Sequence, residues 1–549
     1  MKRAKGTGKD GGSFMSGVFL LSASTLMVKI IGLAYKIPMM NILGAQGMGY
    51  FNSAYEIYAM LCVISTAGLP VALSMMVSAR AQSQDEPAVK RVYRTALMVF
   101  VTLGAVGSAI LWLFARDLSS YIENPDAYGC ILAISPALFC VCISSAVRGY
   151  FQGRSKMLPT ALSQLIEAGG KLVFGILFAI YAIRQGYAMP YVAAYAVMGL
   201  SLGTLLSALY LLAVKLIDGK RGRADSDRAA LPRERGIAKR LLQIAIPITL
   251  GSAVLSLTRV VDMTLIMKRL QDIGYSSAGA NKIYGSYTTM ALPVFSLIPS
   301  LITPVALALV PRLTAALEAK DRETEGLVVR SSMRLTSLFA IPSAVGVAVY
   351  AENILELLFN GQREAIDISA PLLALLGISI FFSCLITTTN AVLQSYSQTT
   401  KPIIAMGVGT VVKAISAYLL IGNASVGVLG APFSTLLCDI TITAINLYYV
   451  NKYVPESDSV GRLYGRPFIA ALSMICVSFA VYMATARFGF ENRAAFVFAM
   501  AAAIPSYLFF ALVYGAVGKE DILMMPYGEK ILSFMCRFGV FGKVKDKKN

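Results

Sequence analysis

Residues 96–115 read ALMVFVTLGAVGSAILWLFA, and this uninterrupted apolar run decides the fold class. A helix rises about 1.5 Å per residue, so about 20 apolar residues cross the roughly 30 Å hydrocarbon core of a bilayer. Residues 495–513 form a second run of this kind. Neither run alternates polar and apolar residues as the strands of a membrane barrel do, so helices are the predicted spanning structure.

Similar runs recur along the whole chain of 549 residues, which is 56% hydrophobic and 14% charged, with a mean hydropathy of +0.66. The sequence therefore predicts an all-α polytopic membrane protein of about fourteen transmembrane helices. The first block, Phe14 to Ile37, is too long and too charged for a cleavable signal peptide, so we interpret it as the first span. The predicted spans are residues 14–37, 47–69, 92–115, 128–147, 158–183, 190–214, 241–266, 283–310, 333–351, 369–390, 402–421, 427–450, 466–486 and 493–516.

The basic residues behind the formal charge of +19 are distributed unevenly between the two sides of the membrane. If the N-terminus is cytoplasmic, 36 Lys and Arg residues lie in or beside the cytoplasmic segments and 8 lie in the opposite loops. By the positive-inside rule this predicts a bacterial cytoplasmic membrane protein with both termini in the cytoplasm. Basic loops that face anionic membrane lipids explain the net charge without a nucleic-acid partner.

A weak internal repeat divides the chain. The tetrapeptide Pro-Val-Ala-Leu occurs at 70–73 and at 304–307, and a Gln and a Lys that lie 19 residues apart occur at 152 and 171 and at 394 and 413. We predict two pseudo-symmetric six-helix lobes in parallel topology, followed by two additional C-terminal helices. The predicted parts are a cytoplasmic N-terminus (1–13), an N-lobe (14–214), a basic cytoplasmic linker (215–240), a C-lobe (241–450), two further spans (451–516) and a basic cytoplasmic tail (517–549).

Ionisable residues inside the predicted spans are the candidate functional residues, because charge in hydrocarbon is costly unless it faces a cavity or a partner. Lys29 and Lys36 lie seven residues apart on nearly the same face of the first span, which suits an elongated anion. Alternatively, Lys36 extends to the outer interface. Arg259 and Asp262, at i and i+3, are close enough to pair on one face. Because Lys29 and Arg259 lie at comparable depths in the opening helices of the two lobes, we expect a shared central cavity.

Other embedded charges extend this set. Glu167 and Lys171, at i and i+4, predict an intrahelical salt bridge. Glu56, Lys413 and Asp439 are each a candidate substrate ligand, gate partner or proton site. We assign to substrate binding Lys29, Lys36, Arg259 and Lys413, and to ion coupling or gating Asp262, Glu56, Glu167, Lys171 and Asp439.

No catalytic or metal site is predicted. The chain has no histidine, and its eight cysteines show neither a metal-ligand spacing nor a disulfide framework. The longest predicted outer loops have only about 17 residues, too few for the extracellular domain and the acid and base that a membrane glycosyltransferase or oligosaccharide ligase needs. We expect a monomer without a cofactor.

Five segments carry a resemblance to a known family: residues 27–38 (MVKIIGLAYKIP), 42–49 (ILGAQGMG), 65–74 (STAGLPVALS), 148–153 (RGYFQG) and 163–167 (SQLIE). Together they resemble the polysaccharide transporter branch of the multidrug/oligosaccharidyl-lipid/polysaccharide (MOP) superfamily. Within this branch the chain is most similar to the stage V sporulation protein B type, which is akin to the lipid II flippases of the MurJ type.

This resemblance implies a flippase that moves an undecaprenyl-diphosphate-linked cell-wall precursor, lipid II or a related lipid-linked oligosaccharide, to the outer leaflet by alternating access. It places the chain in peptidoglycan synthesis, cell shape or sporulation. Lys29 matches an arginine that lines the cavity of MurJ-type proteins, whereas Tyr35, Leu292 and Phe295 stand where these proteins carry charged residues.

The coupling ion stays open between Na+, H+ and the membrane potential alone. Sodium sites of some relatives combine an acid of the seventh helix with an Asn and an Asp of the eleventh, and the resemblance matches Asp262 to the first of these. Residues 413–420 offer no carboxylate for the others.

Two other functions stay open. A cation-coupled multidrug exporter of the same superfamily is one, although cationic drugs favour an acidic cavity and the embedded charges include several cations. A non-transporting scaffold for sporulation or division is the other, since the basic loops offer surfaces for partners.

Overall fold

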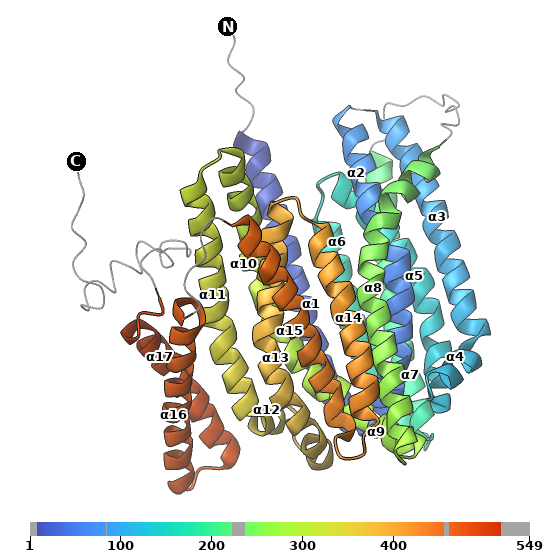
Figure 1. The fold of residues 1–549 in the computed structure, drawn as a ribbon. Helices are drawn as coiled ribbons and strands as arrows, with labels where there is room; N and C mark the ends of the chain where they lie inside the picture. The colour runs from blue at the N-terminus through green and yellow to red at the C-terminus, as the bar shows by residue number, and fades with distance from the viewer. Residues whose placement is uncertain (1–7, 84, 222–235, 455–460, 518–549) are drawn as a thin grey trace, which may run out of the picture. The chain divides into compact units, whose positions relative to one another are not determined.

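The computed structural model describes residues 8–83, 85–221, 236–454 and 461–517, which Figure 1 shows as a ribbon. Every regular element in these ranges is helical, which confirms the predicted all-α class. Nearly all of the predicted tail and the middle of the predicted linker (222–235) lie outside the described residues. The α-helices are α1 (Gly8–Thr66), α2 (Leu69–Gln82), α3 (Glu86–Leu113), α4 (Ala115–Tyr121), α5 (Tyr128–Gly153), α6 (Leu158–Arg184), α7 (Met189–Arg221), α8 (Ile237–Asp272), α9 (Ser277–Ser286), α10 (Leu292–Glu318), α11 (Arg322–Val349), α12 (Ala351–Leu358), α13 (Arg363–Ser395), α14 (Thr400–Ile421), α15 (Gly430–Tyr453), α16 (Arg466–Arg487) and α17 (Asn492–Val513).

Every predicted span overlaps these helices, although the eighth, 283–310, covers the end of α9, a π-helical turn and the start of α10. Twelve helical stretches of the described chain are long and apolar enough to cross a membrane, and one of them, Met27–Ala81, contains parts of the first two predicted spans. α8 coincides with the predicted seventh span but is not among the twelve. The chain is a multi-pass membrane protein.

The chain reverses direction inside α1, at Gly44. Gly44 has φ +62° and ψ −178°, a backbone conformation that is open essentially to glycine alone. The rings of Tyr35 and Phe51, on the two sides of Gly44, have centroids 6.0 Å apart. Sixteen residues of straight helix would separate them by about 24 Å. The two arms of α1 therefore form a hairpin, which supplies the first two predicted spans.

The helices repeat in order and in detail. α3 to α7 follow the pattern long, short, long, long, long, and α11 to α15 follow it again. Asp85 caps α3 by accepting a hydrogen bond from the Ala88 amide, and 236 residues later Asp321 caps α11 by accepting one from the Thr324 amide. The hydroxyl and amide of Thr324 hold the pKa of Asp321 below its ordinary value.

Matching contacts also join the helix ends. Glu86 at the start of α3 pairs with Arg154 just after α5, and Glu325 in the first turn of α11 is hydrogen-bonded by Tyr396 just after α13. Ser155 and Ser397, 242 residues apart, both have a positive φ in the turns that follow. These correspondences, which are structural, strengthen the repeat that the sequence indicated only weakly.

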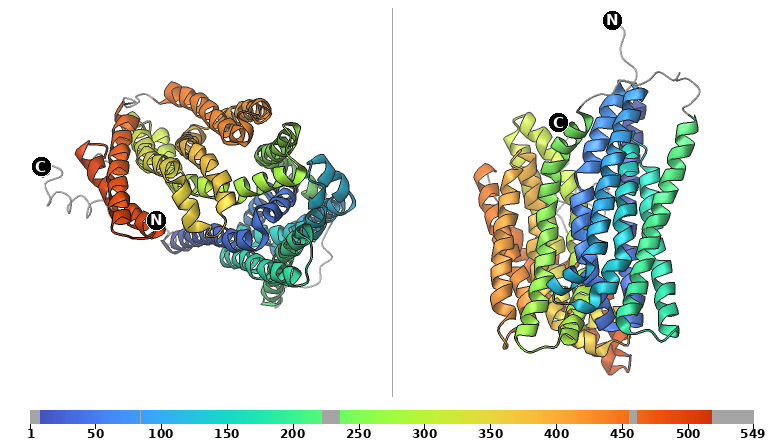
Figure 2. Two further views of the ribbon diagram at one scale, coloured as in Figure 1. Left: turned by 90° about the horizontal axis from the view of Figure 1, so that it is seen from below. Right: turned by 90° about the vertical axis from the view of Figure 1, so that its right-hand side faces the viewer.

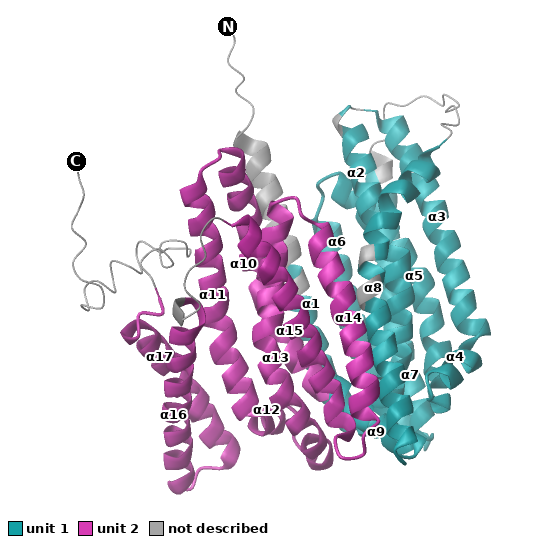
Figure 3. Cartoon of the chain, viewed as in Figure 1, with its two compact units in different colours: residues 1–289 teal, residues 290–549 magenta. Residues whose placement is uncertain are grey.

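The chain packs as two compact units, residues 1–289 and 290–549 (Figure 3). In the first unit, α5, α6 and α7 pack side by side, as Figures 1 and 2 show. α8 and α9 also belong to this unit, so the units defined by packing differ from the lobes defined by the repeat. The lobe boundaries stay a prediction.

Glycines bring α6 and α7 into close contact. A Cβ on Gly203 would lie 2.7 Å from the Lys171 backbone nitrogen and 2.9 Å from the Glu167 carbonyl oxygen. One on Gly199 would lie 2.1 Å from the Gly175 nitrogen. Small residues let membrane helices approach to backbone contact, and here they fix α7 against the part of α6 that carries Glu167 and Lys171.

Candidate functional site

Six of the nine candidate residues come together in the first unit, on α1, α6 and α8. Glu56 lies within electrostatic reach of Lys36, Arg259 and Asp262. Lys171 lies within reach of Lys36 and Glu167. We call these six residues the charge cluster: Lys36, Glu56, Glu167, Lys171, Arg259 and Asp262.

The charge cluster lies near the middle of the spanning helices. Lys171 is 13 residues before the last residue of α6, about 20 Å along the axis, and 13 residues after the first. Arg259 is 13 residues from the last residue of α8. Charges at this depth need partners or a polar cavity, which makes the cluster a functional-site candidate.

Lys36 does not extend to the outer interface. Its Nζ donates to the backbone carbonyl of Thr288 at 2.9 Å. Thr288 lies in a π-helical turn, Tyr287–Ala291, between α9 and α10. A π-turn breaks the regular pairing of helical carbonyls and is frequent at functional sites, and here it supplies an acceptor to a lysine 252 residues away.

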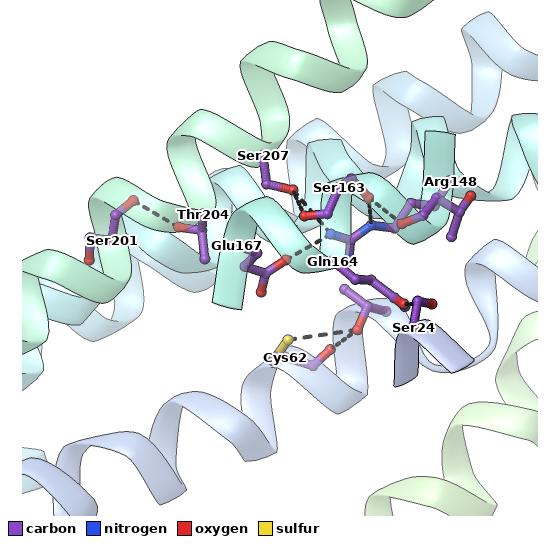
Figure 4. Close-up of polar contacts among 11 residues, drawn as sticks. Ser24, Cys62, Arg148, Ser163, Gln164, Glu167, Ser201, Thr204 and Ser207 are labelled. Atoms are coloured by element: carbon purple, nitrogen blue, oxygen red, sulfur yellow. Dashed lines mark hydrogen bonds and ion pairs between the residues drawn. The ribbon is translucent and has the colours of Figure 1, made fainter. Parts of the chain in front are cut away.

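The predicted bridge between Glu167 and Lys171 is wrong. Glu167 Oε2 accepts from Arg148 Nη2 at 2.8 Å, and the same guanidinium donates to the hydroxyls of Ser163 at 2.9 Å and Ser207 at 3.1 Å (Figure 4). The planar guanidinium of an arginine has five N–H donors and can hold several acceptors in a fixed arrangement. The ammonium of a lysine, on a flexible side chain, fixes several acceptors less well. Arg148 therefore ties α5, α6 and α7 together.

Sequence reasoning placed Arg148 in a loop, because the predicted span ended at 147. In the structure α5 continues to Gly153, and the side chain of Arg148 is only 14% exposed. The missed signal is a pair of glycines: a Cβ on Gly149 would lie 2.9 Å from the Pro70 carbonyl oxygen, and one on Gly153 would lie 2.7 Å from the Ser74 carbonyl oxygen. α5 continues because it packs closely on α2.

Lys171 does not pair with Glu167 and faces aromatic rings instead. Its Nζ lies 5.0 Å from the ring centroid of Tyr35, 5.5 Å from that of Phe51 and 4.7 Å from that of Tyr55. Cations within about 6 Å of a ring face are attracted by its quadrupole. All three rings come from the hairpin of α1, so the lysine joins α6 to both arms.

Arg259 makes no ion pair within 4 Å in the part of the chain that the structure describes, so the predicted pair with Asp262 does not form. Its side chain is exposed, and Glu56 and Tyr55 lie within its electrostatic reach. Lys29, on the first arm of α1, is also exposed.

Lys413 and Asp439 lie in the second unit, on α14 and α15, and face each other electrostatically. Asp439 is 9% exposed, and the Ser383 side chain on α13 is hydrogen-bonded to it. These two residues form a separate, oppositely charged pair. Whether they contribute to one site with the charge cluster stays a prediction.

A neutral polar network that the sequence analysis missed adjoins the charge cluster. Asn52 donates to the hydroxyls of Thr288 and Thr289 at 2.9 and 2.8 Å. Asn124 donates to Ser53 and Asn281, and Asn281 donates to the Gln46 carbonyl at 2.6 Å. We call these residues the α1–α9 lock: Gln46, Asn52, Ser53, Asn124, Asn281, Thr288 and Thr289.

One part of the α1–α9 lock, Asn124 and Asn281, lies in or near loops 122–127 and 273–276, at the end of the helices that the basic-residue distribution predicts to be outside. The other part, Thr288 and Thr289, adjoins the charge cluster. Close backbone contact reinforces the lock, since a Cβ on Gly285 would lie 1.9 Å from the Ala45 carbonyl oxygen. Asparagines inside apolar spans were the available signal, because a buried amide needs hydrogen-bond partners.

The arrangement suits the binding of an anion. Two ammonium groups, Lys36 and Lys171, are held by a carbonyl and by aromatic rings instead of by close carboxylates, and the exposed guanidinium of Arg259 is also without an ion pair in the described residues. In the described part of the chain no group of three or more His, Cys, Asp or Glu side chains could hold a metal ion.

The described part of the chain is all-helical and multi-pass, and it carries charges near the middle of long apolar helices. Comparison with known proteins makes the class definite, a flippase or transporter of the MOP superfamily. The chain belongs to the polysaccharide biosynthesis protein family, whose sequence model matches residues 14–317, and the MatE model matches residues 286–419.

Individual relatives agree. Stage V sporulation protein B of Bacillus subtilis (strain 168) is 24% identical over 526 residues, which are 94% of this chain and 98% of that protein. The lipid II flippase MurJ of the same organism is 25% identical over 73% of this chain and 76% of its own length. A solved structure of a lipid II flippase MurJ in an inward closed conformation has a TM-score of 0.68 at 15% identity and covers 90% of this chain and 98% of its own, which shows the shared fold.

Proposed function

We propose that this protein moves an undecaprenyl-diphosphate-linked cell-wall precursor, lipid II or a related lipid-linked oligosaccharide, from the cytoplasmic to the outer leaflet. The observation that supports the proposal is the pair of ammonium groups, Lys36 and Lys171, on long apolar helices with no carboxylate within 4 Å among the described residues. A diphosphate needs cationic partners to cross hydrocarbon, whereas its lipid tail does not. The relationship to a lipid II flippase agrees with such a substrate.

The proposed cycle is alternating access, with both termini in the cytoplasm. The diphosphate enters from the cytoplasmic side and reaches Lys36 and Lys171 while the α1–α9 lock closes the outer end. Opening outward then requires the hydrogen bonds of Asn52 and Asn124 to break. Because the lock is built from neutral groups, no bare charge is left in hydrocarbon when it opens.

The membrane potential favours this direction of transport. With the inside negative, an anion that moves outward gains about 2.3 kcal/mol per charge per 100 mV. Coupling to Na+ or H+, with Asp262, Glu56 or Asp439 as carrier, would add to this driving force.

Translocation of lipid II in reconstituted vesicles tests the proposal. We expect wild-type protein to move lipid II between leaflets, and Lys29→Ala, Lys36→Ala and Arg259→Ala to slow it. A lysine outside the cluster, Lys268→Ala, serves as the control. If folded wild-type protein leaves the distribution of lipid II between the two leaflets unchanged, the assignment of lipid II as substrate is wrong.

The MatE match over residues 286–419 favours a second candidate, cation-coupled drug export. An exporter of this kind would lower the cellular accumulation of a cationic dye. The cationic residues of the charge cluster argue against it, so we expect no difference in dye accumulation between cells with and without the protein.

A further inference from the structure

Lys171 is the candidate cation whose surroundings differ most from the prediction. Its nearest acid along the helix, Glu167, is bound elsewhere, and in the described part of the chain no carboxylate lies within 4 Å of its Nζ. We propose that Lys171 binds the diphosphate of the substrate and that Arg148 is a positioning residue that keeps it available by holding Glu167. This inference rests on the proposed function, because it names the residues that receive the substrate anion.

The three rings stabilise the ammonium of Lys171 without neutralising its charge. Tyr35, Phe51 and Tyr55 attract the Nζ from 4.7 to 5.5 Å, and Lys171 is still partly exposed. A cation–π contact contributes roughly 0.5–2 kcal/mol. A close ion pair with Glu167 would satisfy the ammonium more completely and would leave less charge for a ligand.

Arg148 prevents Glu167 from competing with the substrate anion for Lys171. On one helix, an acid four residues before a lysine is in the better orientation for a bridge, so Glu167 would otherwise turn to Lys171. The guanidinium of Arg148 takes the carboxylate at 2.8 Å and is itself fixed by Ser163 and Ser207 (Figure 4). Ser207 also donates to the Ser163 carbonyl at 2.9 Å, so the two serines that fix Arg148 are themselves joined to each other.

The repeat provides an internal comparison. The lysine 242 residues later, Lys413, faces the buried carboxylate of Asp439. The residue at the position that corresponds to Arg148 is Asn390, which cannot hold an acid as a guanidinium does. In the second unit the charge of Lys413 is therefore compensated by Asp439. In the first unit Arg148 holds Glu167 away from Lys171.

The ligand that fits is an anion with more than one charged centre. Lys171 on α6 and Lys36 on α1 lie within electrostatic reach of each other, with rings of α1 beside Lys171. Two neighbouring ammonium groups repel each other when the site is empty and are both stabilised when an anion lies between them. A diphosphate presents two charged phosphoryl groups, one for each ammonium.

Binding of a short prenyl diphosphate, farnesyl diphosphate, to the full chain in detergent tests the inference. We expect Lys171→Gln to weaken binding about tenfold or more, since charge-assisted hydrogen bonds are lost. Arg148→Gln should weaken it similarly, because the released Glu167 pairs with Lys171. Glu167→Gln should bind as tightly as wild type or more tightly.

The double variant Arg148→Gln/Glu167→Gln decides between electrostatic positioning and mere structural support. If Arg148 acts by holding Glu167, removal of both should restore binding to near the level of Glu167→Gln. A double variant as weak as Arg148→Gln, or unchanged binding in Lys171→Gln, would overturn the inference. If Arg148→Gln does not fold, Arg148→Lys, which retains a cation beside Glu167, should bind more tightly than Lys171→Gln, and equal weakness would count against the positioning role.

Binding and transport separate the two proposals. Lysine controls outside the charge cluster, such as Lys268→Gln, should bind the probe as wild type does. A wild-type protein that binds the probe through Lys171 but moves no lipid II contradicts the proposed function alone. A wild-type protein that moves lipid II while Lys171→Gln binds and transports unchanged contradicts this inference alone.

Discussion

Asn52 shows how a single neutral residue joins the second arm of α1 to the turn after α9. It is buried, and its amide nitrogen donates to two threonine hydroxyls in the turn after α9. A neutral hydrogen bond contributes only about 0.5–1.5 kcal/mol net, so such bonds can hold a conformation without making it permanent. At the scale of residues, the proposed function assigns substrate affinity to the charge cluster and reversible closure to the lock.

We expect Asn52→Ala to favour the open form of the lock. The change leaves two buried hydroxyls with fewer partners and costs about 1–3 kcal/mol in the closed form only. A cysteine at Gln46 in a cysteine-free background should then react faster with a membrane-impermeant maleimide. Asn423→Ala, on an exposed turn, should not change the rate, and equal rates in all three proteins would contradict a gating role for the lock.

Sequence spacing could predict which residues carry charge inside the membrane but not which partners they choose. The i,i+4 rule concerns one isolated helix, and it predicted that Glu167 would bind Lys171. Arg148 on another helix offers a fork that also satisfies two serines, and the rings that receive Lys171 come from a third helix. Such choices depend on tertiary packing, which one helix cannot reveal.

At the scale of elements, apolar run length was sufficient to place most of the spans, because the bilayer sets the length that a helix needs. The short helices α4 and α12 were not predicted. They directly follow α3 and α11, so no polar interruption marks the bend, and their equivalence becomes visible only when the two halves are compared.

The hairpin of α1 depends on Gly44. We expect Gly44→Ala to lower the melting temperature in detergent, because its backbone conformation costs about 1–3 kcal/mol for a residue with a Cβ. No neighbouring atom would clash, so the effect isolates backbone strain. Gly32→Ala is the matched control: it is also free of contacts but has no positive φ, and it should be neutral or slightly stabilising. Equal melting temperatures would contradict the strain at Gly44.

The contact between α6 and α7 depends on Gly203. We expect Gly203→Ala to push α7 away from the backbone of Glu167 and Lys171, at a cost of about 1–3 kcal/mol, and to weaken transport through the displaced lysine. Gly169→Ala on the same helix pair has nothing within 4 Å of the new Cβ. If both variants melt and transport alike, the close packing does not position the site.

At the scale of the molecule, the membrane environment and the all-α class were readable from hydropathy, whereas the predicted number of about fourteen spans compares with twelve candidate spans in the described part of the chain. The repeat was only weakly readable, because four apolar residues recur readily in such a composition. The caps at Asp85 and Asp321 and the turns at Ser155 and Ser397 support it with features that apolar composition does not produce.

The orientation of the whole chain is open to a direct test. We expect a cysteine at Asp126, which is exposed beside the lock, to react with an impermeant reagent from outside intact cells. A cysteine at Asp225, in the predicted linker, should react only after permeabilisation. The opposite pattern would reverse the topology and the proposed direction of transport.

The bond between Lys36 and Thr288 also affects how the protein is made. The two residues are separated by 252 positions, and ribosomes add about 5–20 residues per second. For roughly ten to fifty seconds after Lys36 enters the bilayer, the acceptor for its ammonium does not yet exist. Biogenesis therefore has to shelter this charge with water, lipid phosphate or the insertion machinery, and the first unit is complete only once the turn after α9 has been synthesised.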